Sequence, residues 1–89
     1  MEITDVKIRR ITHESKMRAI VSVTFDDALV VHDIKVIAGN EKLFLAMPAR
    51  RRADGDFADI AHPTCSALRN ELEARVLARY REAEAQANT

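Results

Sequence analysis

The sequence has few of the residues that carry covalent, redox or stacking chemistry. Its 89 residues include no tryptophan, one cysteine, two glycines and two prolines, and aromatic residues make up only 4% of the chain. The single cysteine, Cys65, excludes an internal disulfide and is typical of a reducing compartment, so we expect a cytoplasmic protein. The glycines belong to separate turns, which excludes a glycine-rich phosphate loop.

Long apolar runs are missing too. No segment approaches the roughly 20 apolar residues that a membrane-spanning helix needs, and residues 1–10 do not resemble a signal peptide. We therefore expect no membrane association. The formal net charge is zero, so the overall charge gives no support for nucleic-acid binding. Locally, however, five cations and a single acid lie between Lys7 and Arg18.

The size and composition of the chain fit one folded domain. The chain is 47% hydrophobic and 31% charged, which is ordinary for a globular protein, and 89 residues leave no room for two cores. We predict a single domain over residues 1–89. Residues 84–89 contain no large apolar side chain and are expected to fray.

Four segments show the patterns of β-strands. They are Ile3–Thr12, Met17–Phe25, Leu29–Ala38 and Leu43–Met47. Met17–Phe25 alternates strictly, whereas the alternation of the first strand slips near Arg10, which suggests a bulge. Leu43–Met47 is continuously apolar and is expected to be buried on both faces. The connections are short, which predicts an antiparallel meander.

The third strand contains a histidine whose surroundings can be predicted from the alternation. A regular strand would place two sets of side chains on opposite faces, namely Val30, His32, Ile34 and Val36 against Val31, Asp33, Lys35 and Ile37. His32 and Asp33 would then point to opposite sides and form no acid–base pair. We interpret His32 as a hydrogen-bonded core or edge histidine.

The pattern changes to that of a helix after Pro63. Apolar residues recur at Leu68, Leu72, Val76 and Tyr80, with Leu77 beside them, and Glu71 and Arg75 are spaced as an i,i+4 ion pair. The sequence therefore predicts an α+β fold: an antiparallel sheet of four to five strands with one C-terminal helix packed on it.

No set of residues has the spacing of a catalytic or metal site. His62 and Cys65 are three residues apart, but no second ligand pair exists, and structural zinc needs four ligands. The serines lie outside any nucleophile-elbow context, and Cys65 has no evident base. We predict no metal, no cofactor, no small-molecule substrate and no enzymatic activity.

The most informative feature is a run of three arginines, Arg50–Arg52, followed by Asp54 and Gly55. Asp-Gly is typical of a type I′ hairpin, which needs positive φ at both central residues. The two local acids, Asp54 and Asp56, are too few to neutralise three guanidinium groups. The residues alone leave two interpretations open: a solvated loop that keeps a sheet edge soluble, or a phosphate-binding finger.

Several motifs together resemble one bacterial family. The segments MEITDVKIRR, MRAIVSVTFDD, VVHDIKVIAGN, LFLAMPARR and DGDFADIAHP, in this order and spacing, closely resemble the SpoVG (stage V sporulation protein G) family. The resemblance covers Met1 to about Arg81. It implies a homodimer with a regulatory role in septation and sporulation that binds DNA and, in some members, RNA. By matching positions, Arg50 and Arg51 fall in the basic loop of the family, and Arg69 lies early in its helix.

The chain departs from this family at two positions near the turn. Ala58 stands where relatives often carry a cation, whereas Arg52 adds one. Two functional hypotheses follow. The first is a dimeric nucleic-acid-binding regulator that uses Arg50, Arg51, Arg52 and Arg69. The second is an interaction module of cell division that docks through a sheet edge without nucleic acid.

Overall fold

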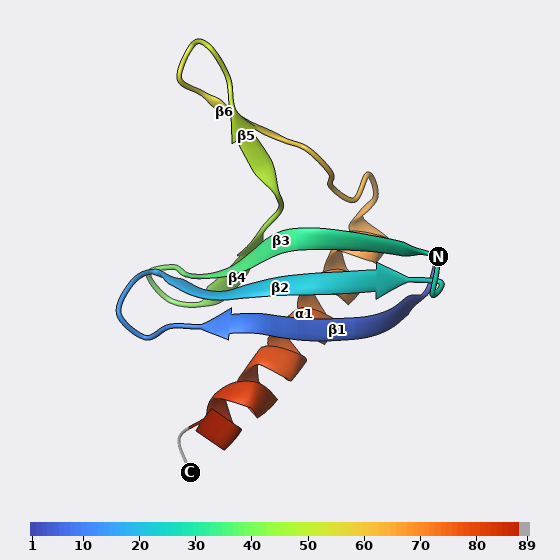
Figure 1. Ribbon diagram of the computed structural model, residues 1–89, viewed down its shortest axis with the longest axis vertical. Coiled ribbons are helices and arrows are strands. Elements are labelled where there is room, and N and C mark those ends of the chain that lie inside the picture. Colours follow the sequence, from blue (N-terminus) through green and yellow to red (C-terminus); the bar gives the residue numbers. More distant parts are fainter. Residues whose placement is uncertain (88–89) are drawn as a thin grey trace.

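The computed structural model of the chain, described here for residues 1–87, is a four-stranded sheet with one helix on it and a hairpin that projects from it (Figure 1). The sheet contains β1 (Ile3–Ile11), β2 (Met17–Phe25), β3 (Leu29–Ala38) and β4 (Leu43–Ala46), antiparallel and in sequence order. Strands β5 (Ala49–Arg51) and β6 (Phe57–Asp59) form the hairpin, and α1 spans Ser66–Ala87. The predicted α+β meander with a C-terminal helix is confirmed.

One face of the sheet forms the core with the helix. Helix α1 contacts the two edge strands, β1 and β4, and therefore crosses the sheet (Figure 1). The predicted apolar stripe faces the sheet, with Leu68 half-buried and four residues buried: Leu72, Val76, Leu77 and Tyr80. The sheet contributes mainly alanine and β-branched side chains, namely Ala19, Val21, Val23, Ile34 and Val36. These residues suit a pleated surface that is covered on one side.

The predicted faces of the third strand are wrong, because β3 contains a bulge. Asp33 has a φ of 64°, and the pairing of β2 with β3 shifts between Val21, which faces Ile34, and Val23, which faces Val31. The extra residue reverses the alternation, so Val31 and Ile34 both lie on the helix side. A simple period of two cannot reveal such an insertion. The bulge predicted near Arg10 in β1 is confirmed by a register shift between Ile8 and Arg10.

Strand β4 is not buried on both faces as the sequence predicted. It is the last strand of the sheet, and Phe44 pairs with Ile37 on the face without a helix. The Phe44 side chain is 40% exposed. The burial of β4 is therefore decided by its position at the edge of the sheet and not by its apolar sequence. As a result, the apolar side chain of Phe44 lies beside an unpaired strand edge.

The helix extends further than expected at its C-terminal end. Residues 84–87, assigned to a frayed tail, are helical, and residues 88–89 lie outside the described part of the chain. The expected ion pair between Glu71 and Arg75 does not form. Arg79 and Glu82 form an ion pair instead, with 4.0 Å between Nη1 of Arg79 and Oε1 of Glu82. No helix within residues 1–87 is long and apolar enough to cross a membrane.

Candidate nucleic-acid interface

The arginine run lies on a hairpin, residues 49–59, which we call the arm. The arm rises from the end of β4 and points away from the sheet and helix (Figure 1). Pro48 ends the pairing of β4, and its carbonyl oxygen accepts a 2.7 Å hydrogen bond from the N–H of Ile60 at the base of the arm. Near the tip, the N–H of Arg52 donates to the carbonyl oxygen of Asp56 at 2.6 Å. These bonds give the arm a fixed shape although almost all of its side chains are exposed.

The turn at the tip differs from the predicted type I′ turn. Its hydrogen bond runs from the N–H of Gly55 to the carbonyl oxygen of Arg52 at 3.0 Å, and Gly55, with a φ of 93°, is its one residue of positive φ. Such a three-residue loop, a turn followed by a glycine, is a common hairpin connection. Positive φ at both central residues occurs instead between β2 and β3, at Asp26 and Asp27. Asp-Gly thus predicted the hairpin but not its geometry.

The three arginines of the arm are divided between its two sides. Arg51 pairs with Phe57 and Arg50 pairs with Ala58, so Arg51 shares a side with Phe57 while Arg50 lies on the other. By continued alternation, Arg52 lies on the side of Arg50. All three side chains are exposed, and within residues 1–87 none of them forms an ion pair. The Asp54 carboxylate instead accepts the N–H of Asp56 at 3.0 Å.

The fourth predicted residue, Arg69, lies on a different element. It is exposed in the first turn of α1, where its N–H donates to the carbonyl oxygen of Cys65 at 3.2 Å. No hydrogen bond or ion pair within the described residues connects its side chain to the arm. The structure therefore brings Arg50, Arg51 and Arg52 together and leaves Arg69 apart from them.

A second group of cations, which the sequence analysis did not identify as a site, lies on the face of the sheet without a helix. Lys7 pairs with Ser22, and Ile20 pairs with both Arg10 and Lys35, so these cations share one face. The Ser22 hydroxyl lies 2.8 Å from Nδ1 of His32, which places this histidine on the same face. Lys7, Arg10, His32 and Lys35 are all exposed. Simple alternation does not group these residues, because the bulge between Ile8 and Arg10 brings Arg10 to the face of Lys7, and the bulge at Asp33 brings Lys35 to the face of His32.

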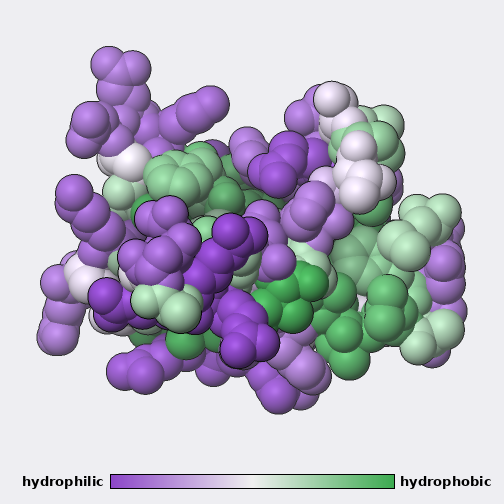
Figure 2. Space-filling model, turned by 90° about the horizontal axis from the view of Figure 1, so that it is seen from above, coloured by the Kyte–Doolittle hydropathy of each residue, from purple (hydrophilic) through white to green (hydrophobic). Residues whose placement is uncertain are grey.

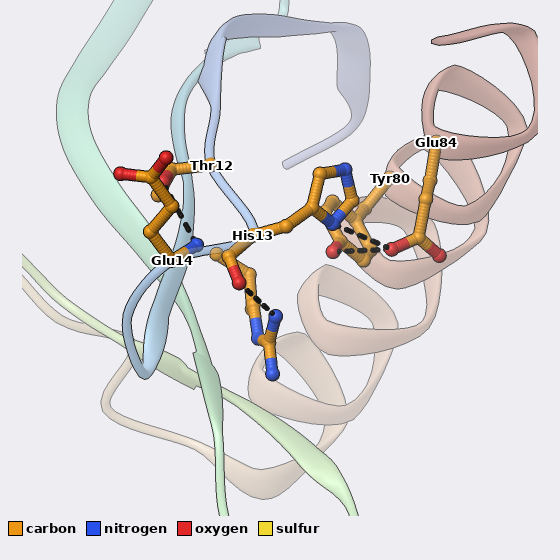
Figure 3. A network of polar contacts seen from close by, with 6 residues as sticks. Thr12, His13, Glu14, Tyr80 and Glu84 are labelled. Carbon is orange, nitrogen blue, oxygen red and sulfur yellow. Dashed lines mark hydrogen bonds and ion pairs between the residues drawn. The ribbon is translucent and has the colours of Figure 1, made fainter. Parts of the chain in front are cut away.

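A polar network on the opposite side of the molecule has a structural role. The Tyr80 hydroxyl donates to Oε2 of Glu84 at 2.9 Å, and Nδ1 of His13 lies 3.7 Å from the same oxygen (Figure 3). The Arg18 guanidinium donates to the carbonyl oxygen of His13 at 3.2 Å. Burial, and then the hydrogen bond and charge of Glu84, raise the pKa of Tyr80. The network joins the helix to the β1–β2 connection.

The other polar residues do not assemble a reactive centre in the described part of the chain. Residues 1–87 contain no cluster of three or more histidine, cysteine, aspartate or glutamate residues that could hold a metal ion. A ring nitrogen of His62 bonds to the carbonyl oxygen of Pro63 at 3.0 Å. Cys65 is a free, exposed thiol. The strongest candidate site is therefore the arm, which suits an anionic partner.

Fold and site together define a small α+β protein in which a hairpin with three exposed arginines projects from a body of four strands and one helix. Comparison with known families identifies it more closely. The model of the SpoVG family matches residues 1–82, and the chain belongs to that family.

Curated relatives support this assignment over most of their length. The chain is 59% identical over 80 residues to the "Putative septation protein SpoVG" of Alkaliphilus oremlandii, covering 90% of this chain and 86% of that protein. It is 60% identical over 80 residues to the protein of the same name from Clostridium acetobutylicum, covering 90% and 84%. The Thermoanaerobacter sp. protein is 55% identical over 86 residues, covering 97% and 94%. These names refer to septation and not to an enzymatic activity.

Proposed function

We propose that the chain is a homodimeric regulatory protein that binds the phosphate backbone of DNA, and also of RNA, through the arm. The observation that carries this proposal is the set of three exposed arginines, without ion pairs in the described structure, on a hydrogen-bonded hairpin. A guanidinium group presents a planar fork of donors that matches a phosphate, and it stays charged at any physiological pH. Contacts of this kind position a protein on nucleic acid without reading its sequence.

Two further groups of cations support an extended contact. Lys7, Arg10 and Lys35 lie together on the open face of the sheet, and Arg69 lies at the start of α1. The chain as a whole carries no net charge, so attraction to a polyanion depends on such local groups. The arm is the primary site in our proposal because its three arginines lie together on a hairpin that projects away from the sheet and the helix (Figure 1).

The homodimer is supported by surface that one copy leaves uncovered. Beyond the core between helix and sheet, Phe57 and Ile60 are apolar side chains that are 71% and 66% exposed. Small domains bury a modest part of their surface, so pairing of two copies adds stability. A dimer would also present two arms and thereby twice the number of exposed arginines. The names of the relatives support a role in septation. The single cysteine supports a cytoplasmic location for that role.

The test is a fluorescence-anisotropy titration of labelled duplex DNA and single-stranded RNA at several salt concentrations. If each arm neutralises two or three phosphates, a dimer neutralises roughly four to six, and log affinity should fall against log salt with a slope of about −4 to −5 on duplex DNA. Absence of binding to either nucleic acid at low salt would contradict the proposal.

The second candidate function is an interaction module of cell division, which the exposed Phe44 on the open edge of β4 favours. Docking through a sheet edge depends on backbone hydrogen bonds and apolar contacts, and responds weakly to salt. A protein that binds no nucleic acid, but binds a division protein with an affinity independent of salt, would establish this function instead.

A further inference from the structure

An apolar pocket lies at the base of the arm, between the start of α1 and one end of the sheet. Its volume is about 250 Å³, and its walls are formed mainly by Phe25, Leu29, Val31, Met47 and Leu68. No aspartate, glutamate, lysine or arginine lines it. Figure 2 shows apolar surface gathered on one side of the molecule, the side on which the N-terminus lies in Figure 1. The pocket is therefore suited to an apolar side chain.

Two apolar side chains, Phe57 on the arm and Ile60 at its base, are left largely uncovered by the described residues 1–87. Phe57 is 71% exposed and Ile60 is 66% exposed. Phe57 lies on the same side of the arm as Arg51, away from Arg50. A large aromatic side chain that is mostly exposed on a charged hairpin is typical of an interface anchor.

The arm cannot easily place Phe57 in the pocket of its own chain. The bond from the Ile60 N–H to the carbonyl oxygen of Pro48 closes the base of the arm, and the pairing of β5 with β6 keeps it extended away from the body (Figure 1). Folding back would break these bonds. An occupant from a second copy requires no such rearrangement.

We propose that two copies exchange their arms, so that Phe57 of each copy fills the apolar pocket of the other. An apolar cavity of about 150 Å³ accepts benzene, so this pocket has room for the Phe57 ring and part of Ile60. Because one phenylalanine buries roughly 150–250 Å², two arms and two pockets would remove on the order of 1,000 Å² from water. A specific interface needs about this area.

This arrangement assigns different roles to the arginines of the arm. The side with Phe57 and Arg51 would face the partner, whereas Arg50 and Arg52 would point outward toward a ligand. A two-fold axis would make both contacts equivalent. The inference rests on the homodimer of the proposed function, but it does not depend on nucleic-acid binding.

The first test is sedimentation equilibrium of the full chain with Phe57→Ala. Loss of both aromatic anchors should weaken dimerisation at least tenfold, because a few buried anchor residues carry most of the binding energy of an interface. The matched control is Phe44→Ala, which removes the other exposed phenylalanine and should change dimerisation less than threefold. Circular dichroism verifies folding. Unchanged dimerisation of Phe57→Ala would overturn the arm exchange. A larger effect of Phe44→Ala would also overturn it and would indicate pairing through β4.

The second test mixes two variants, one that cannot accept Phe57 in its pocket and one that lacks the Phe57 side chain. Leu29→Glu adds a charge to the pocket at a position that is 52% exposed and therefore tolerant of substitution, but leaves the arm intact. Phe57→Ala leaves the pocket intact. Each variant alone should be largely monomeric, whereas the mixture should form heterodimers through one remaining contact. A mixture that associates no better than either variant would overturn the proposal.

A wild-type protein that stays monomeric at roughly tens of micromolar would overturn both the arm exchange and the homodimer. The occupant of the pocket would then be a different protein. Nucleic-acid binding by that monomer would keep the remaining part of the proposed function intact. A dimer that survives Phe57→Ala would remove the arm exchange alone. These measurements therefore distinguish failure of the arm exchange from failure of the proposed function.

Discussion

The body and the arm of this protein are stabilised in different ways. The body buries aliphatic side chains between sheet and helix, and seven of its large side chains are less than 2% exposed, including Ile34, Leu72 and Val76. The arm is held by backbone hydrogen bonds, and its arginines and Phe57 are exposed. Apolar burial is the dominant favourable term in folding, so the free energy of folding should come from the body. The arm can then carry charge at little cost to stability.

The largest effect should follow from damage to the body. Leu72→Ala removes a side chain that is 1% exposed and should lower the free energy of unfolding by about 2–5 kcal/mol, through lost burial and a cavity. Glu71→Ala, one position earlier and exposed, should stay within about 0.5 kcal/mol. Urea denaturation measures both. Equal losses would show that the body does not depend on this helix face.

A smaller and local effect should follow from damage to the arm. Gly55→Ala forces a side chain into a backbone with a φ of 93°, which costs on the order of 1–3 kcal/mol. The added Cβ meets no atom closer than 3.9 Å, so the strain is confined to the backbone. Amide hydrogen exchange should accelerate at Arg52 and Ile60 and stay unchanged in β2. Loss of global stability by the same amount would mean that body and arm unfold together.

The tyrosine network of the body predicts a pH dependence. Because the pKa of Tyr80 is raised in the folded protein, its contribution to stability is complete below the unfolded value of about 10 and is lost as pH rises through the folded pKa. Tyr80→Phe should remove that loss. At pH 7 it should cost about 0.5–1.5 kcal/mol, the value of one hydrogen bond. Urea denaturation between about pH 7 and 11 checks both, and an unchanged pH profile would contradict this role.

The sequence predicted the body better than the arm for a physical reason. Alternation along Met17–Phe25 and the stripe through Leu72 and Val76 report burial directly, because one face must be apolar. The bulge at Asp33 depends on the pairing of two strands, and the exposure of Phe44 depends on which strand ends the sheet. Neither property belongs to a single segment.

The candidate site was likewise predicted only in part. The arginine run and Asp-Gly indicated a basic hairpin, and the structure contains one. The sequence did not show that Arg51 and Arg50 lie on different sides, because that depends on the register of β5 against β6. Nor did it show that Phe57 would be exposed. The nucleic-acid role of Arg50, Arg51, Arg52 and Arg69 stays a prediction.

The most direct test of this division between body and arm replaces Arg50, Arg51 and Arg52 by alanine and measures stability and binding on the same sample. The free energy of unfolding should change by less than about 0.5 kcal/mol, because exposed charges contribute little to folding. Affinity for duplex DNA should fall, and the slope of log affinity against log salt should become flatter, while Arg81→Ala, an exposed cation on the helix, serves as the control. A folded triple variant with unchanged affinity and slope would contradict the account.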